Sequence, residues 1–268
     1  MAEHYSQAGK LAENAEQHQR HLEQMVAYYQ RTAGDYSKWH CNHAGSSHDY
    51  AVRKVIEFMS GRELTSVLDV CCGTGRCIAT ARAAGFDATG IDISKELLEA
   101  GMKEFDLPAD RMIQGDATAL PFPDNSFDVA CILGALHHTA MPHTIIDEMI
   151  RVSRQVVVVS DEANHLHGAI RSMLMRTGLF SPVYRLIFRR EPKLKRRSMD
   201  SEGDGPTFDF TIEEIIPALK ARLPVFQSMS FIRIGKSQFR VPWWPRMFAT
   251  QAVVVAATVS GETEGGVG

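Results

Sequence analysis

Residues 67–75 read VLDVCCGTG, and this stretch decides the fold. A short apolar and β-branched run passes through Asp69, and Gly73 and Gly75 come just before a helix-like segment at 76–84. Glycine lets a backbone approach a ligand closely, and the amides at a helix N-terminus can bind the ligand's polar groups. The stretch therefore predicts a strand, a ligand-binding loop and a helix, in that order.

The alternation of strands and helices continues along the chain. The apolar runs predict seven strands, at residues 66–70, 87–91, 111–114, 127–133, 156–160, 226–234 and 250–259. Helical patterns occur at residues 95–104, 143–152 and 211–221, the first of them with Ser94 as its N-cap. This order predicts an α/β fold with a doubly wound, mostly parallel seven-stranded sheet.

The composition is that of an ordinary globular protein. Of the 268 residues, 44% are hydrophobic and 23% are charged, which is enough to bury a core without covalent links. The formal net charge of −3 gives no overall attraction to nucleic acid. The sequence shows no secretory signal and no apolar run long enough to cross a bilayer, so a cytoplasmic location is expected.

Cysteines and histidines do not indicate a metal site. Three of the five cysteines, Cys71, Cys72 and Cys77, lie within seven residues, in a spacing that fits no zinc signature. The histidines also lack the carboxylate or cysteine spacing of a metal centre. We expect reduced, buried cysteines and no bound metal.

Residues around the loop narrow the choice of ligand. Asp92 ends the second strand, where a carboxylate can bind ribose hydroxyls. Ile78 stands where a dinucleotide-binding loop has its third glycine, and Asp69 would repel a pyrophosphate. The pattern favours a ligand with an amino group and a sulfonium over a dinucleotide. A tight turn that binds no ligand is the alternative.

Three segments resemble the class I S-adenosylmethionine-dependent methyltransferases, especially their small-molecule branch, which includes the quinone methyltransferases. These segments are VLDVCCGTG at 67–75, GIDIS at 90–94 and GDATALPFPDNSFD at 115–128. The resemblance implies a Rossmann-like methyltransferase fold with S-adenosylmethionine as its cofactor. Cys71 replaces the first glycine of the commoner loop pattern, so we expect no glycine-type backbone conformation there.

The resemblance also assigns cofactor-binding roles. The implied residues are Asp69, Cys71, Gly73, Gly75, Asp92, Ile93, Asp116, Ala117 and Leu133. Asp69 would orient the methionine amino group, and Asp92 would bind the ribose diol. Ile93 would pack on adenine, Asp116 would accept from the adenine amino group, and Leu133 would lie beside the methionine arm.

The N-terminal segment resembles the lid of the same branch. Tyr28 and Tyr36 would place aromatic faces near the sulfonium, where cation–π attraction stabilises a positive charge. Alternatively, these rings only pack a helix onto the sheet. The expected organisation is a helical lid at 1–50, a cofactor-binding core at 51–161, a helical insertion over the acceptor pocket at 162–210, the end of the sheet at 211–259 and a disordered tail at 260–268.

His137 and His138 follow the fourth strand, at the sheet edge where ligands of open α/β sheets bind. Either residue could act as a general base, which is useful when the acceptor carries a proton. Packing on the cofactor is the other interpretation of this pair.

Residues 165–197 are basic and amphipathic. They form a solvated face over a core, a pocket for an acidic acceptor, or a contact with an anionic membrane that carries a lipid-like acceptor. The oligomeric state is not indicated by the sequence.

The expected function is transfer of a methyl group from S-adenosylmethionine to O, N or C of a small molecule, by in-line displacement that releases S-adenosylhomocysteine. One alternative is a nucleic-acid methyltransferase, which the negative net charge and the absence of an Asn/Asp-Pro-Pro-Tyr element after strand four disfavour. A non-catalytic scaffolding protein with the same fold is the other alternative.

Overall fold

The structure is a computed structural model that describes residues 2–40, 47–162, 198–201, 205–208, 210–234, 237–241 and 251–257. Its α-helices are α1 (Ala2–His40), α2 (Ser47–Met59), α3 (Arg76–Ala83), α4 (Lys95–Phe105), α5 (Pro142–Val152) and α8 (Ile216–Arg222). Short 3₁₀ turns are η1 (Ala109–Arg111), η2 (Leu136–His138) and η3 (Ile212–Glu214).

The strands fall into two sheets. The large sheet holds β1 (Ser66–Val70), β2 (Asp87–Asp92), β3 (Met112–Gln114), β4 (Phe127–Leu133), β5 (Ser153–Glu162), β8 (Val225–Ile234), β9 (Ser237–Val241) and β10 (Gln251–Ala257). Strands β6 (Ser198–Ser201) and β7 (Gly205–Phe208) form a separate antiparallel pair.

The large sheet has the order β3-β2-β1-β4-β5-β10-β8-β9. The first five strands are parallel, and β10 runs antiparallel to both β5 and β8. The predicted doubly wound, mostly parallel sheet is therefore confirmed with its seven expected strands, and β9 extends it by an eighth at the edge. The chain runs from β1 through β2 to β3 on one side and then crosses back to β4 on the other side of β1. The strand order therefore reverses at β1, and the crevice at this switch point lies beyond the carboxyl ends of β1 and β4.

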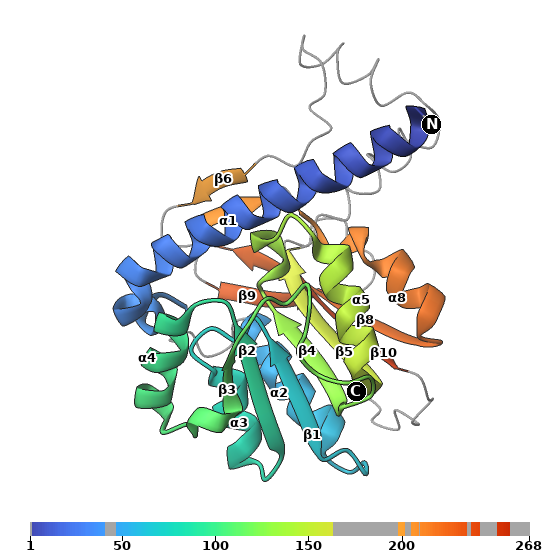
Figure 1. Cartoon of the computed structure of the whole chain (residues 1–268). Coiled ribbons are helices and arrows are strands. Elements are labelled where there is room, and N and C mark those ends of the chain that lie inside the picture. The colour runs from blue at the N-terminus through green and yellow to red at the C-terminus, as the bar shows by residue number, and fades with distance from the viewer. Residues whose placement is uncertain are drawn as a thin grey trace.

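Helices cover both faces of the sheet (Figure 1). On one face, Leu68, Val157 and Val254 pack with buried residues of α5 and α8. On the other face, Val67 and Val158 pack with buried residues of α2 and α3. This division follows from the two-residue period of strands, in which neighbouring side chains point to opposite faces.

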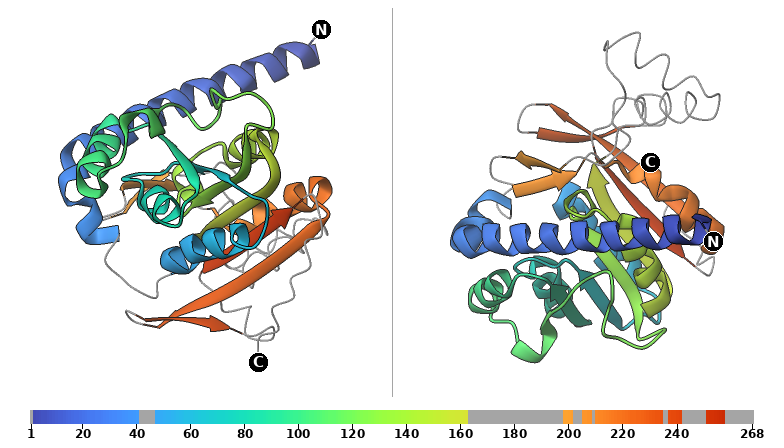
Figure 2. Two further views of the ribbon diagram at one scale, coloured as in Figure 1. Left: turned by 90° about the horizontal axis from the view of Figure 1, so that it is seen from below. Right: turned by 45° about the horizontal axis from the view of Figure 1, so that its top comes forward.

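Helix α1 occupies most of the segment at 1–50 that was expected to be a helical lid. It is one helix that continues through Gly34 to His40. Both α1 and α2 begin within the segment expected as the lid, because α2 starts at Ser47. Figure 1 and the right-hand view of Figure 2 show α1 crossing the edge at which β4 and β5 end.

The insertion differs from the expectation in the part that the structure describes. Residues 198–201 and 205–208 form the β6–β7 hairpin, so the prediction of a helical insertion is wrong here. Gly205 and Pro206 at the start of β7 explain the difference, because glycine and proline are the poorest helix formers. The basic segment to residue 197 and the tail at 260–268 lie outside the described residues.

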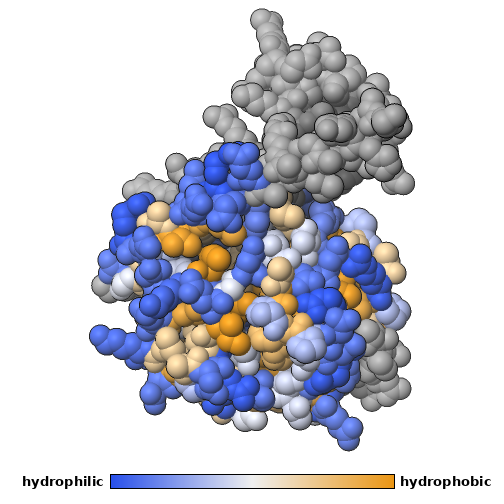
Figure 3. All heavy atoms as spheres, viewed as in Figure 1, coloured by the Kyte–Doolittle hydropathy of each residue, from blue (hydrophilic) through white to orange (hydrophobic). Residues whose placement is uncertain are grey.

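Polar side chains cover most of the face seen in Figure 3, with apolar side chains showing in the gaps between them. Among the described helices, none is long and apolar enough to span a membrane.

Candidate functional site

The loop after β1 has an unusual backbone. Cys71, Gly73 and Gly75 all have positive φ angles, of 56°, 55° and 77°. The expectation of an ordinary conformation at Cys71 is therefore wrong, although a left-handed non-glycine residue costs about 1–2 kcal/mol. Two backbone hydrogen bonds hold the loop in place, from Cys72 N to Ile91 O (3.0 Å) and from Gly75 N to Cys72 O (2.9 Å).

Asp92, at the end of β2, faces this loop. Its Oδ2 accepts from the Gly73 amide and its Oδ1 from the Ser94 amide, both at 2.9 Å. Burial raises the pKa of Asp92 above its ordinary value, although these amide bonds act in the opposite direction. A carboxylate oxygen has two lone pairs, so each oxygen can accept a further bond from a ligand hydroxyl.

Asp116 follows β3, in a turn at the same edge of the sheet as Asp92. Its Oδ1 accepts from the Thr118 amide (2.8 Å), and its Oδ2 lies 3.1 Å from His18 Nε2 of α1. Partial burial raises the pKa of Asp116, but the hydrogen bonds from His18 and Thr118 outweigh it, so the net pKa lies below the ordinary value.

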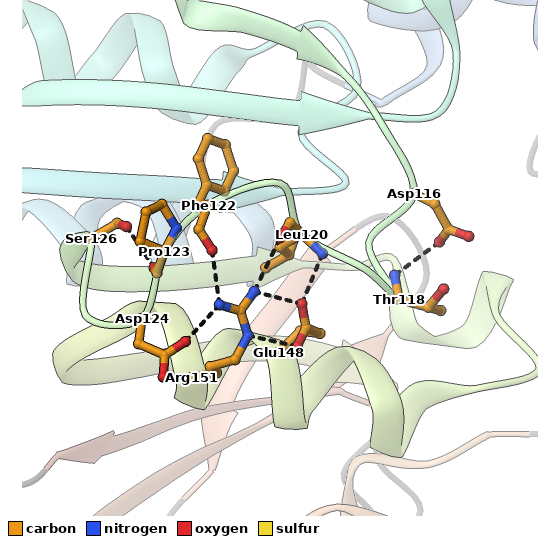
Figure 4. Close-up of polar contacts among 9 residues, drawn as sticks. All are labelled: Asp116, Thr118, Leu120, Phe122, Pro123, Asp124, Ser126, Glu148 and Arg151. Atoms are coloured by element: carbon orange, nitrogen blue, oxygen red, sulfur yellow. Dashed lines mark hydrogen bonds and ion pairs between the residues drawn. The ribbon is translucent and has the colours of Figure 1, made fainter.

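Arg151 of α5 holds the chain that connects Asp116 to β4 (Figure 4). Its guanidinium donates to the carbonyls of Leu120 (3.0 Å) and Phe122 (2.8 Å) and to Asp124 (2.9 Å). Glu148 accepts from Arg151 and also from the Leu120 amide (2.8 Å). This network ties the loop to α5 and so fixes the path from Asp116 to β4.

A cavity of about 90 Å³ lies between α1 and the strand ends. Nine of the predicted site residues line it: Tyr36, Cys71, Gly73, Asp92, Ile93, Asp116, Ala117, Leu133 and His138. They come from α1 and from the segments after β1, β2, β3 and β4, which are far apart in the sequence.

Four predicted site residues do not line the cavity. Tyr28 packs its ring edge-on against Tyr29, with centroids 5.2 Å apart, and Tyr29 lines the cavity instead. Gly75 is the N-cap of α3, where a Cβ atom would come within 2.8 Å of Leu107. Asp69 and His137 lie behind the cavity wall.

Asp69 is buried beneath the loop. Its Oδ1 accepts from the Cys131 thiol at 3.5 Å, and the Sγ atoms of Cys131 and Cys77 lie 3.9 Å apart. Burial raises the pKa of Asp69 to about 7. Within the described residues, Cys71, Cys72, Cys77 and Cys131 are free thiols. Cys77 is buried as expected, whereas Cys71 and Cys72 are only partly buried.

The two histidines of η2 have different surroundings. His137 Nδ1 donates to Asp161 Oδ1 (2.8 Å), and Asp161 Oδ2 accepts from the Leu136 amide (2.7 Å). His138 lines the cavity, and its Nδ1 lies 2.9 Å from the Pro206 carbonyl. A carbonyl can only accept, so the proton of a neutral His138 is on Nδ1 and the basic atom is Nε2.

Several cavity residues on α1, and one on its neighbour α4, were not predicted from the sequence. They include His18, His21, Leu22, Met25, Tyr29 and Leu97. A usable signal was present, because residues 18, 21, 22, 25, 29 and 36 recur at intervals of three, four and seven and so share one helix face.

A protein-family profile and several known proteins are similar to this chain. A family profile described as a methyltransferase domain matches residues 68–158, which carry the loop, Asp92, Asp116 and η2. This segment of the chain is therefore similar to methyltransferase domains. Demethylmenaquinone methyltransferases of Staphylococcus aureus strains Newman and COL are 35% identical over 134 residues, or 48% of this chain. The match covers 56% of each of these relatives, so the chain spans about half their length.

Solved structures of two other proteins have a similar fold. Magnesium protoporphyrin IX methyltransferase from Synechocystis PCC 6803, with bound S-adenosylhomocysteine, matches with a TM-score of 0.54 at 15% identity, over 89% of this chain and 100% of that chain. A possible histamine N-methyltransferase from Thermotoga maritima gives a TM-score of 0.53 at 15% identity, over 86% and 98%. At this identity the likeness concerns the fold alone.

Proposed function

We propose that this protein transfers a methyl group from S-adenosylmethionine to a small-molecule acceptor and releases S-adenosylhomocysteine. The observation that carries the proposal is the convergence of three segments on one cavity. Asp92 and Asp116 follow the adjacent strands β2 and β3, and the loop at 71–75 enters from β1, in a chain with a methyltransferase domain.

The donors and acceptors on the cavity wall fit the adenosine part of this cofactor. The Asp92 oxygens are held by the Gly73 and Ser94 amides and keep capacity for a ribose diol. Ile93 and Ala117 offer apolar contact to adenine, and Asp116 offers an acceptor for its amino group.

The loop and the end of β4 fit the methionine arm. Cys71, Gly73 and Leu133 line this part of the cavity, and a Cβ atom at Gly73 would lie 3.4 Å from the Tyr36 ring. Tyr36 therefore lies close to the path of a sulfonium, which an aromatic face attracts. Asp69 and Gly75 support the loop from behind rather than touching the cofactor.

When bound, the cofactor supplies an electrophilic methyl group on a sulfonium. The protein's own part is orientation, exclusion of water and removal of a proton from the acceptor. We infer that His138 takes that proton through Nε2 when the acceptor is a hydroxyl or an ammonium, because His138 lines the cavity and its Nδ1 faces the Pro206 carbonyl. Asp161 and His137 hold η2, and so hold His138 at the cavity wall.

The acceptor is best described as a small molecule with a substantial apolar part. Leu22, Met25, Ala135 and Ile145 give the cavity apolar walls, and the similar proteins from Staphylococcus aureus are named for demethylmenaquinone. The same proposal includes an acidic or lipid-like acceptor, contact with a membrane through residues 165–197 and a cytoplasmic location.

Transfer of labelled methyl from S-adenosylmethionine tests the function. The purified protein is incubated with small-molecule, nucleic-acid and protein fractions of a cell extract, with Asp92→Ala as the binding-defective control. We expect label in the small-molecule fraction with the wild type only. Label in nucleic acid, or cofactor binding without any transfer, would overturn the proposal in favour of the two alternative functions.

A further inference from the structure

His18 of α1 contacts the carboxylate proposed to bind adenine. Its Nε2 lies 3.1 Å from Asp116 Oδ2, and its side chain is 11% exposed. A carboxylate can only accept, so His18 donates this bond. The adenine amino group is a donor as well, and it would approach the same carboxylate from the cavity that His18 also lines.

Other residues of α1 also contact the elements that surround the cavity. His21 Nε2 donates to the His138 carbonyl, and the His21 ring lies against Phe208 of β7 with centroids 4.5 Å apart. Further along the helix, Met25 and Tyr29 pack on Leu97 of α4. The helix thus covers the cavity from Asp116 to the loop at Gly73.

The covered cavity is small for the proposed ligand. Its volume is about 90 Å³, whereas sites for ligands of this size occupy roughly 300–1,000 Å³. An outward shift of α1 from the strand ends would enlarge the cavity, and it would break the bond between His18 and Asp116.

The rings of His18 and His21 each form a hydrogen bond through only one of their two nitrogen atoms, which lowers the free-energy cost of such a shift. The Nδ1 atoms of His18 and His21 are both buried and have no hydrogen-bond partner. Outward movement of the helix exposes them to water, and this offsets part of the contacts that are lost.

We propose that His18 is a latch that competes with the cofactor for Asp116 and so sets the affinity for S-adenosylmethionine. This inference rests on the proposed function, because it takes Asp116 as the adenine acceptor. Release of the latch frees the Asp116 Oδ2 atom and opens the cavity together.

Calorimetric titration with S-adenosylhomocysteine tests the latch. His18→Ala removes the competing donor, and we expect its Kd to fall about 3- to 30-fold, a range that discounts a charged hydrogen bond for partial exposure. His18→Gln keeps a donor and should bind within about threefold of the wild type. Gln19→Ala, at an exposed position on the same turn, serves as the control and should not differ from the wild type.

A double-mutant cycle separates the bond from the space that alanine creates. With Asp116→Asn in both proteins, His18→Ala should tighten binding by less than twofold. The latch is overturned if His18→Ala binds no tighter than the wild type, or if it tightens binding equally in the Asp116→Asn background. If none of these proteins binds S-adenosylhomocysteine, the proposed function itself fails, and that outcome is distinct from the other two.

Discussion

At the scale of single residues, Asp69 shows how burial changes the role of a carboxyl group. Its side chain lies beneath the loop, bonded to the Cys131 thiol, and burial raises its pKa to about 7. The folded protein therefore keeps a proton on Asp69 at pH values at which the unfolded chain has released it. The stability that Asp69 contributes is complete below pH 4 and is lost as the pH rises through about 7.

Replacing Asp69 by asparagine removes this dependence. Relative to the wild type, the unfolding free energy of Asp69→Asn should rise by about 2–4 kcal/mol between pH 5 and pH 8. Urea unfolding at both pH values measures it. Asp128→Asn is the control, because hydrogen bonds from Thr65, Ser66 and Arg154 hold the pKa of Asp128 below its ordinary value. Its difference from the wild type should not change over this range, and a constant difference for Asp69→Asn would contradict the account.

The sequence identified acidic residues more reliably than aromatic ones at this scale. Asp92 and Asp116 line the cavity because the carboxyl ends of parallel strands share one edge. Tyr29 and Tyr36 also line it, whereas Tyr28 does not. Residues 29 and 36 are seven positions apart, which is almost two full helical turns, so their side chains point in nearly the same direction. Residues 28 and 36 are eight positions apart, so their side chains point about 80° away from each other. Without knowing that α1 is one unbroken helix, the sequence could not decide between Tyr28 and Tyr29.

At the scale of elements, the packing of α4 against the loop depends on one glycine. A Cβ atom at Gly101 would lie 1.9 Å from the Thr74 carbonyl oxygen. In contrast, Gly34 is exposed within α1, and nothing lies within 4 Å of a Cβ atom there. The two glycines are thus a matched pair, each in a helix, of which only one has a structural reason to lack a side chain.

Alanine substitution should have opposite effects at these two sites. Gly101→Ala should lower the unfolding free energy by about 3 kcal/mol, because either α4 or the loop must move. Gly34→Ala should raise it by about 0.5–1 kcal/mol, because alanine favours the helix. Chemical denaturation of the two variants measures both effects. Equal effects at the two positions would show that the close contact between α4 and the loop does not matter.

The elements that the sequence failed to predict lie at the margins of the sheet. Strand β9 is an edge strand five residues long, and the β6–β7 hairpin interrupts a segment that reads as helical elsewhere. Neither belongs to the alternation of strands with helices that made β1 to β5 predictable. Helix α1 passed through Gly34 because a single exposed glycine weakens a helix without ending it.

At the scale of the whole molecule, the site is assembled between a predictable sheet edge and a less predictable cover. The order of strands brings the loop, Asp92 and Asp116 together. Helix α1 then adds His18, His21, Met25 and other side chains, which precede the lid-like stretch that contains Tyr28 and Tyr36. Motifs therefore indicated the cofactor half of the cavity, whereas the half formed by α1 depends on tertiary packing.

The central claim is that this cavity binds S-adenosylmethionine through Asp92. Calorimetric titration of the wild type with S-adenosylmethionine, beside Asp92→Ala, tests it most directly. Asp87→Ala is the matched control, because Asp87 lies at the other end of β2 and pairs with Arg111. We predict saturable binding by the wild type and the control, and a loss of about 1–3 kcal/mol in Asp92→Ala. Absence of binding by the wild type, or equal binding by Asp92→Ala, would contradict the account.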